Sequence, residues 1–162
     1  MKLSSYVTLI GQDTQIAQNK FTASVAVTVS PELASELLIA GIQLTQDYAG
    51  GAGGVNLTAA GTLYFFNADP AIAAGTAIDG LTAAQVAKIV SQQAVVAGDW
   101  VDLATTLTSY AHIGAVQLGA ATGELKLPYL STVWVAFLYT GATTFNSAAG
   151  DQEVLKIRLL YK

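Results

Sequence analysis

The chain has 162 residues, with seven Lys and Arg, eleven Asp and Glu, one His and no Cys. Charged residues make up 11% of the chain and hydrophobic residues 52%, whereas about 25% of residues are charged in an average globular domain. This composition excludes a disordered chain, a disulfide framework and thiol chemistry. Six Lys and one Arg also cannot form the basic stripe that nucleic-acid binding requires.

The length is that of one domain with a sizeable core, and we expect a single β-rich domain over residues 1–162. The apolar run Val133–Tyr139 has seven residues, and a membrane-spanning helix needs about 20. The first ten residues contain one Lys and no long apolar segment, so no secretory signal is expected. The excess hydrophobicity is therefore expected in a soluble core and in subunit interfaces.

The first part of the chain predicts two strands and then a helix. Tyr6–Ile10 and Phe21–Val29 are strand candidates, and apolar residues alternate strictly in the second. Ser30 then provides a helix N-cap, and Pro31 suits the first helical position. These signals predict a short α-helix over about residues 31–40.

The rest of the chain predicts mainly strands after a glycine-rich loop at Gly50–Gly54. Gly61–Asn67 is a β-prone run that ends before Pro70, and Thr82 is an N-cap for a second short α-helix over about residues 83–91. Further strands are predicted at Gln93–Val96, Trp100–Leu103, Ile113–Leu118, Leu125–Leu127, Thr132–Tyr139 and Val154–Tyr161. The expected fold is mainly β, a single-domain sandwich or barrel-like fold with two short α-helices.

Catalytic groups are scarce. His112 is the only histidine and lies between hydrophobic neighbours, which favours a structural or surface role. Asp99 and Asp102 could be the carboxylate pair of a glycosidase, although acids at turns and strand edges are far commoner. Asp151 and Glu153 are interpreted as loop charges, with only a weak case for calcium ligation. We therefore predict that the protein is not an enzyme and has no catalytic residue, metal or cofactor.

Three blocks of sequence from Gly61 onward resemble a known group of proteins. The blocks are Leu63–Pro70, Leu81–Val90 with Val95–Trp100, and Ser131–Gly141 with Glu153–Leu159. In these blocks, the sequence resembles tailed-bacteriophage virion proteins, the small head-decoration or accessory capsid proteins. The resemblance implies a compact β-rich domain on the outside of the capsid shell.

The resemblance also implies a non-enzymatic structural protein, made in the host cytoplasm and located on the capsid exterior, which it stabilises. Its expected partners are the major capsid protein and further copies of itself, with a trimer as the expected oligomer. Neither nucleic acid nor a membrane is an expected partner. Low charge and abundant Ala, Gly and Thr suit repeated docking on a symmetric shell. We select Tyr129, Trp134 and Phe145 as candidate interface residues.

Two alternatives remain open. The chain could be an accessory protein of the tail or a vertex instead of the head. It could also be a glycan-binding β-sandwich module, free or displayed on a virion, in which aromatic residues stack on sugar rings. The candidate stacking residues are Tyr48, Tyr110, Tyr129 and Trp134. Sugar binding that is lost on substitution of Tyr48 or Tyr110 would favour this alternative.

Overall fold

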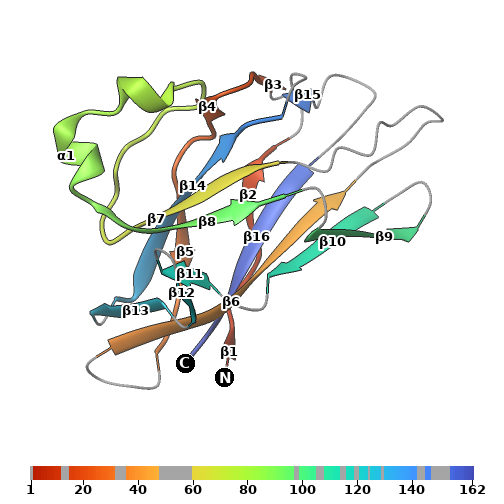
Figure 1. Cartoon of the computed structure of the whole chain (residues 1–162). Coiled ribbons are helices and arrows are strands. Elements are labelled where there is room, and N and C mark those ends of the chain that lie inside the picture. The colour runs from red at the N-terminus through yellow and green to blue at the C-terminus, as the bar shows by residue number, and fades with distance from the viewer. Residues whose placement is uncertain are drawn as a thin grey trace.

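The computed structural model describes residues 2–11, 15–31, 36–47, 60–96, 99–104, 108–113, 116–118, 121–123, 125–128, 130–141, 145–146 and 154–162. In these residues nearly all regular structure is β, and the paired strands are antiparallel. The strands form one seven-stranded sheet, one five-stranded sheet and two small two-stranded sheets. The predicted mainly β, sandwich-like fold is therefore confirmed (Figure 1).

The first sheet has the strand order β1–β16–β6–β10–β9, with β2 also paired to β16 and β13 also paired to β6. Because β1 pairs with β16, the first and last strands lie side by side, and both ends of the chain reach the same edge of the molecule (Figure 1). Its strands are β1 (Lys2–Leu3), β2 (Val7–Ile10), β6 (Glu36–Asp47), β9 (Trp100–Ala104), β10 (Thr108–Ile113), β13 (Leu125–Pro128) and β16 (Val154–Tyr161).

The second sheet is built around β14, which pairs with β7 on one side and with β4 and β5 on the other, while β8 follows β7. Its strands are β4 (Lys20–Phe21), β5 (Val25–Thr28), β7 (Gly61–Phe66), β8 (Ile89–Val95) and β14 (Thr132–Tyr139). The smaller elements are β3 (Gln15–Ile16), which pairs with β15 (Phe145–Asn146), β11 (Val116–Leu118), which pairs with β12 (Ala121–Gly123), the 3-10 helix η1 (Ile78–Gly80) and the helix α1 (Ala83–Val86).

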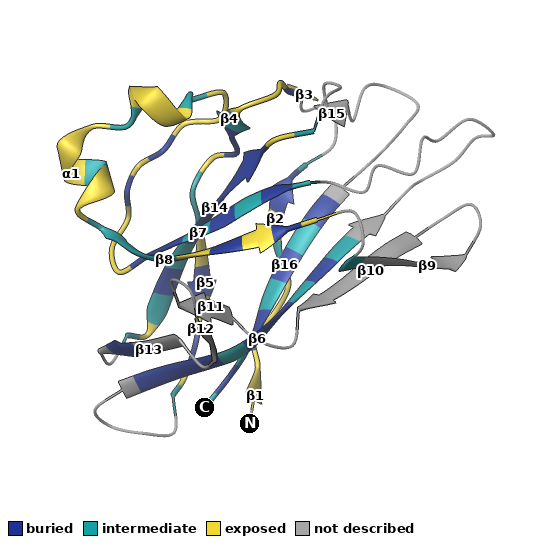
Figure 2. Cartoon of the chain, in the orientation of Figure 1, coloured by how far each residue is buried: buried dark blue, intermediate teal, exposed yellow. Residues whose placement is uncertain are grey.

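The main core lies between the two large sheets. Alternate residues of each strand point to opposite faces of a sheet, so every second residue of β14 and β16 enters this core. Val133, Val135 and Phe137 from β14 share one buried cluster with Leu155 and Ile157 from β16. Figure 2 shows the burial concentrated along β14, β7, β16 and β6. Two sheets that enclose one apolar layer form a β-sandwich.

The outer face of the second sheet is covered by the segment that connects β7 to β8. This segment, residues 67–88, contains η1 and α1 and is called the cap below. Beneath it lies a second buried cluster of Phe21, Phe66, Ile72, Ala136 and Leu138. The second sheet is thus apolar on both faces, which explains the continuous apolar run in β14.

The helix predicted over residues 31–40 is wrong for residues 36–40, while residues 32–35 lie outside the described residues. Residues 36–47 form β6, which pairs with β16, β10 and β13. The pairing with β16 shifts register between Leu160 and Tyr161, so that Ile39 and Ile42, three positions apart, are both buried. Leu37, Leu38 and Ile39 are buried in succession, which is not a helical pattern, and strand pairing on both sides of β6 outweighs the local capping signals.

The helix predicted over residues 83–91 is correct at its start and wrong at its end. Thr82 is the N-cap, and its side chain accepts a hydrogen bond from the Gln85 N–H in a complete capping box. However, α1 ends at Val86. Ile89 is already the first residue of β8, and it pairs with Phe66 of β7. The β-branched residues that the prediction assigned to a helix instead begin a strand, as their β propensity favours.

Candidate interaction surface

The cap is tied to the second sheet by backbone hydrogen bonds to β4 and the residues after it. The Phe21 N–H donates to the Thr76 carbonyl oxygen, and the Gly75 N–H donates to the Phe21 carbonyl oxygen, both at 2.8 Å. Gly75 has a φ of 85°, a left-handed conformation that glycine adopts without strain. These bonds give the cap a defined position without strand pairing along its whole length.

Polar groups fix the beginning and the end of the cap to each other. The Gln85 side chain accepts from the Thr82 N–H at 2.9 Å, and its Nε2 donates to the Pro70 carbonyl oxygen at 3.0 Å. The Lys88 ammonium donates to the Asp69 carbonyl oxygen, and the Asn67 N–H donates to the Lys88 carbonyl oxygen. The two ends of the connection are therefore closed against each other, and α1 is anchored although it has a single turn.

The inner side of the cap buries aromatic residues of the sheet. The rings of Phe21 and Tyr64 meet edge to face, with centroids 5.3 Å apart. Burial raises the pKa of the Tyr64 hydroxyl above its ordinary value of 10.0. Tyr64, Leu81, Ile89 and Trp134 are partly buried at the margin of the cluster beneath the cap.

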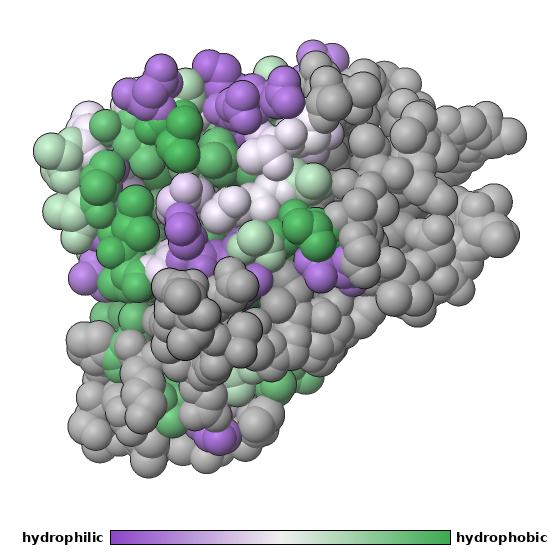
Figure 3. All heavy atoms as spheres, in the orientation of Figure 1, coloured by the Kyte–Doolittle hydropathy of each residue, from purple (hydrophilic) through white to green (hydrophobic). Residues whose placement is uncertain are grey.

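The outer side of the cap carries exposed apolar residues beside two exposed acids, Asp69 and Asp79. Ile78 and Val86 are 45% and 50% exposed. Figure 2 shows α1 and its neighbours exposed, and Figure 3 shows hydrophobic residues gathered over the flank where α1 lies. The exposed small residues of the cap are Ala68, Ala71, Ala73, Ala74, Ala83, Ala84 and Ala87. Large apolar side chains that stay exposed on a fixed segment are candidates for a contact site.

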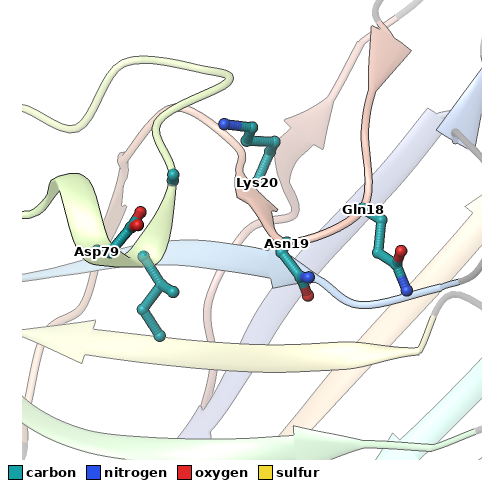
Figure 4. Close-up of a pocket in the computed structure, with 6 residues that line it drawn as sticks. Gln18, Asn19, Lys20 and Asp79 are labelled. Atoms are coloured by element: carbon teal, nitrogen blue, oxygen red, sulfur yellow. The ribbon is translucent and has the colours of Figure 1, made fainter.

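A hollow of about 430 Å³ opens between the cap and the chain at the start of β4. Gln18 and Asn19 line it from the turn before β4 and Lys20 lines it from β4, while Ala77, Ile78 and Asp79 line it from the cap (Figure 4). Asn19 has a φ of 59°, a backbone conformation in which asparagine is enriched. The residues lining the hollow include no aromatic side chain, so this hollow lacks the stacking group on which the glycan hypothesis depends.

Of the three predicted interface residues, the structure describes the backbone positions of two. Trp134 lies in β14, opposite Phe66 in β7 and Ala26 in β5, at the margin of the cluster beneath the cap. Phe145 lies in β15, where its backbone pairs with Ile16. Tyr129 lies outside the described residues. Their role in an interface stays a prediction.

Of the residues that were considered for catalysis, Asp99 lies in the turn before β9, Asp102 in β9 and His112 in β10. The Asp99 carboxylate accepts from the Val96 N–H at 2.8 Å and so stabilises the turn between β8 and β9. Asp102 pairs through its backbone with Ser109, and His112 pairs with Gln43. In the described residues no three His, Cys, Asp or Glu side chains gather where they could hold a metal ion.

Other sequence predictions lie outside the described residues. Asp151 and Glu153 are among them, as is Tyr48, and the side chain of Tyr110 is also not described. A search of the described part of the chain finds no helix with the length and apolarity needed to cross a membrane.

No protein-family model matches the chain, and comparison with curated proteins and with solved structures gives no significant match.

The sequence prediction also missed the cap as a surface. Its signal was present as an alanine-rich segment between two strands, and nothing in that pattern indicates which side of the segment becomes exposed.

Proposed function

We propose that the chain is a non-enzymatic structural protein of a bacteriophage virion, which decorates the outer surface of the capsid and stabilises it as a homo-oligomer. The observation that carries this proposal is the exposed apolar surface of the cap, with Ile78 and Val86 about half exposed on a well-anchored segment. Interfaces between permanent subunits are more apolar than ordinary protein surface. The cap is therefore assigned to the contact between copies of this chain.

The placement of the resembling blocks supports the same proposal. Leu63–Pro70 covers most of β7 and the start of the cap, Leu81–Val90 covers α1 and the start of β8, and Ser131–Gly141 contains β14. These segments lie together in the second sheet and its cap, so the likeness to virion proteins is concentrated around the proposed contact surface. Two blocks reach the first sheet: Val95–Trp100 ends at the first residue of β9, and Glu153–Leu159 includes most of β16.

The mechanism follows from mass action and from multivalency. Anything that binds the assembled state in preference to the separated subunits stabilises it. An oligomer that engages several capsid subunits at once converts later binding events into intramolecular ones, so weak individual contacts give strong overall attachment. No bond is made or broken, and no catalytic group is needed.

The proposal is tested by oligomer mass and capsid binding of matched variants. Val86→Asp and Ile78→Asp each place a negative charge on the exposed side of the cap, and Gln92→Glu places one on exposed β8 outside the cap. We expect the wild type and Gln92→Glu to form the same oligomer in light scattering and to sediment with capsids that lack this protein. We expect both cap variants to dissociate and to bind those capsids weakly.

Two results would overturn this proposal. A wild-type chain that is monomeric and stays in the supernatant would remove the proposed function. Cap variants with wild-type oligomer mass and wild-type thermal unfolding would remove the cap from the contact between copies. In that case the subunit contact would have to be sought at Trp134 or elsewhere.

A further inference from the structure

The hollow between the cap and β4 carries two side chains of opposite charge on its two walls. Lys20 lies in β4, and Asp79 lies in η1. Figure 4 shows their charged ends turned toward each other across the space between β4 and η1, while Gln18 and Asn19 point away from them. Within the described part of the chain, neither the Lys20 ammonium nor the Asp79 carboxylate forms a hydrogen bond or an ion pair.

The backbone that carries both charges is held in place. Lys20 pairs with Tyr139 of β14 on one side and forms a β-bridge with Ala77 of the cap on the other. Ala77 in turn begins η1, where its carbonyl oxygen accepts from the Gly80 N–H at 3.0 Å. Because Ala77 contacts one wall and begins the other, the fold sets the spacing between the backbones of Lys20 and Asp79.

The hollow adjoins the surface that the proposed function assigns to the contact between copies. Ile78, which is 45% exposed, precedes Asp79 and also lines the hollow. A contact made through Ile78 therefore removes water from Lys20 and Asp79 as well. Charges that lose water without gaining a partner destabilise a contact, so the opposite surface must place a negative group at Lys20 and a positive group at Asp79.

We propose that the opposite surface is the same hollow of a second copy, with Lys20 of each copy opposite Asp79 of the other. This inference rests on the assignment of the cap to the contact between copies under the proposed function. A two-fold contact uses the same patch on both subunits, so that patch must be complementary to itself. A patch with one positive and one negative residue meets this condition without any group from a further protein.

The two-fold arrangement satisfies more of these charges at each contact than a ring of three does. A two-fold contact contains two pairs between Lys20 and Asp79, whereas each contact in a three-membered ring contains one. Exposed ion pairs add little affinity, so the apolar residues of the cap supply most of the binding free energy. The charges fix the orientation of the two copies, because the wrong orientation brings like charges together.

Charge reversal at either position tests the pairing. Lys20→Glu makes both charges of the hollow negative, and Asp79→Lys makes both positive, so the two-fold contact of either variant joins like charges. We expect each substitution to raise the dissociation constant of the dimer about a hundredfold or more, measured by light scattering over a dilution series. The double variant Lys20→Glu, Asp79→Lys restores opposite charges, and its dissociation constant should return to within about threefold of the wild-type value.

Mixing the two single variants is the sharper test, because it needs no further substitution. The negative hollow of Lys20→Glu should bind the positive hollow of Asp79→Lys, so an equal mixture should form mixed dimers. Native mass spectrometry with one variant ¹⁵N-labelled identifies them by mass. A ring of three cannot be restored in this way, since an odd number of subunits leaves one contact between like charges. Mixed dimers would also show that both variants are folded.

Three results would overturn the proposal. The first is a wild-type chain that is monomeric throughout the dilution series. The second is a wild-type dissociation constant in both single variants, with Gln92→Glu as the control for an added negative charge outside the cap. The third is an equal mixture that stays monomeric although both variants unfold at the wild-type temperature.

Capsid binding distinguishes failure of this inference from failure of the proposed function. If both single variants keep the wild-type oligomer mass and all three proteins bind capsids, the virion role stands and the pairing of Lys20 with Asp79 is lost. If the wild type and the mixture form dimers but the wild type does not bind capsids, the virion role is lost and the pairing stands.

Discussion

Ser24 and Ile72 are joined by two reciprocal hydrogen bonds, although one lies in the β4–β5 connection and the other in the cap. The Ser24 N–H donates to the Ile72 carbonyl oxygen at 3.0 Å, and the Ile72 N–H donates to the Ser24 Oγ at 3.2 Å. Ile72 is 3% exposed and belongs to the cluster beneath the cap. The pair thus anchors the cap where its only deeply buried large side chain enters the sheet.

Ser24→Ala is expected to loosen this anchor. The substitution leaves the Ile72 N–H without its acceptor, and an unsatisfied buried donor costs about 1–3 kcal/mol. Urea unfolding should show this loss in the free energy of unfolding, and hydrogen exchange at Ile72 should accelerate. Ser30→Ala is the matched control, because Ser30 is exposed and should change stability by less than about 0.5 kcal/mol. Equal stability of the two variants would mean that Ser24 does not anchor the cap.

Gly61→Ala is expected to destabilise the second sheet. A Cβ at this position would overlap the Leu138 carbonyl oxygen and lie 2.5 Å from the Phe137 Cζ. Overpacking of this kind costs about 1–3 kcal/mol, which thermal unfolding can measure. At Gly80 the nearest atom to an added Cβ is 3.9 Å away, so Gly80→Ala serves as the control and should unfold like the wild type. A stable Gly61→Ala variant would show that β7 and β14 are not paired as described.

Tyr64 should make the free energy of unfolding depend on pH in the alkaline range. Burial raises its pKa in the folded chain above the ordinary value of 10.0, so between those two pKa values the folded state holds a proton that the unfolded state has lost. This contribution to stability is complete below about pH 10 and disappears as the pH rises through the folded-state pKa. Tyr64→Phe should therefore flatten the decline in the free energy of unfolding above pH 10. If both proteins decline in parallel, Tyr64 is not protected by the cap.

Trp134→Ala is expected to lower oligomer stability and capsid occupancy, as the sequence prediction for this residue requires. Because Trp134 also packs at the margin of the cluster beneath the cap, the substitution will lower the stability of each subunit as well. Trp134→Phe, which retains an aromatic ring in the cluster, is the control for this effect. Occupancy that follows subunit stability alone across the two variants would count against an interface role for Trp134.

Strands with a strong local pattern were predictable from the sequence. Thr132–Tyr139 and Val154–Tyr161 have the predicted bounds, because alternation and β-branched or aromatic residues agree with the tertiary pairing. β6 was not predictable in the same way. Its N-terminal signals are local helix signals, whereas its state is decided by pairing with β16 from the other end of the chain.

The surfaces for which a function is proposed were harder to predict from the sequence than the strands were. The cap has no periodic apolar pattern, since its inner contacts come from isolated residues such as Ile72 and Leu81. Lys20 and Asp79 lie far apart in the sequence and look like ordinary surface charges. Only the bridge between Lys20 and Ala77 reveals that the two residues line one hollow.

The most direct measurement is quantitative mass spectrometry of purified virions from the source of this chain, with copies counted against the major capsid protein. We predict a copy number comparable with that of the major capsid protein, as decoration of the whole head lattice requires. A few copies per particle would indicate a tail or vertex location. Absence from the particles would contradict the virion function, and screening of the chain against glycans would then be the next experiment.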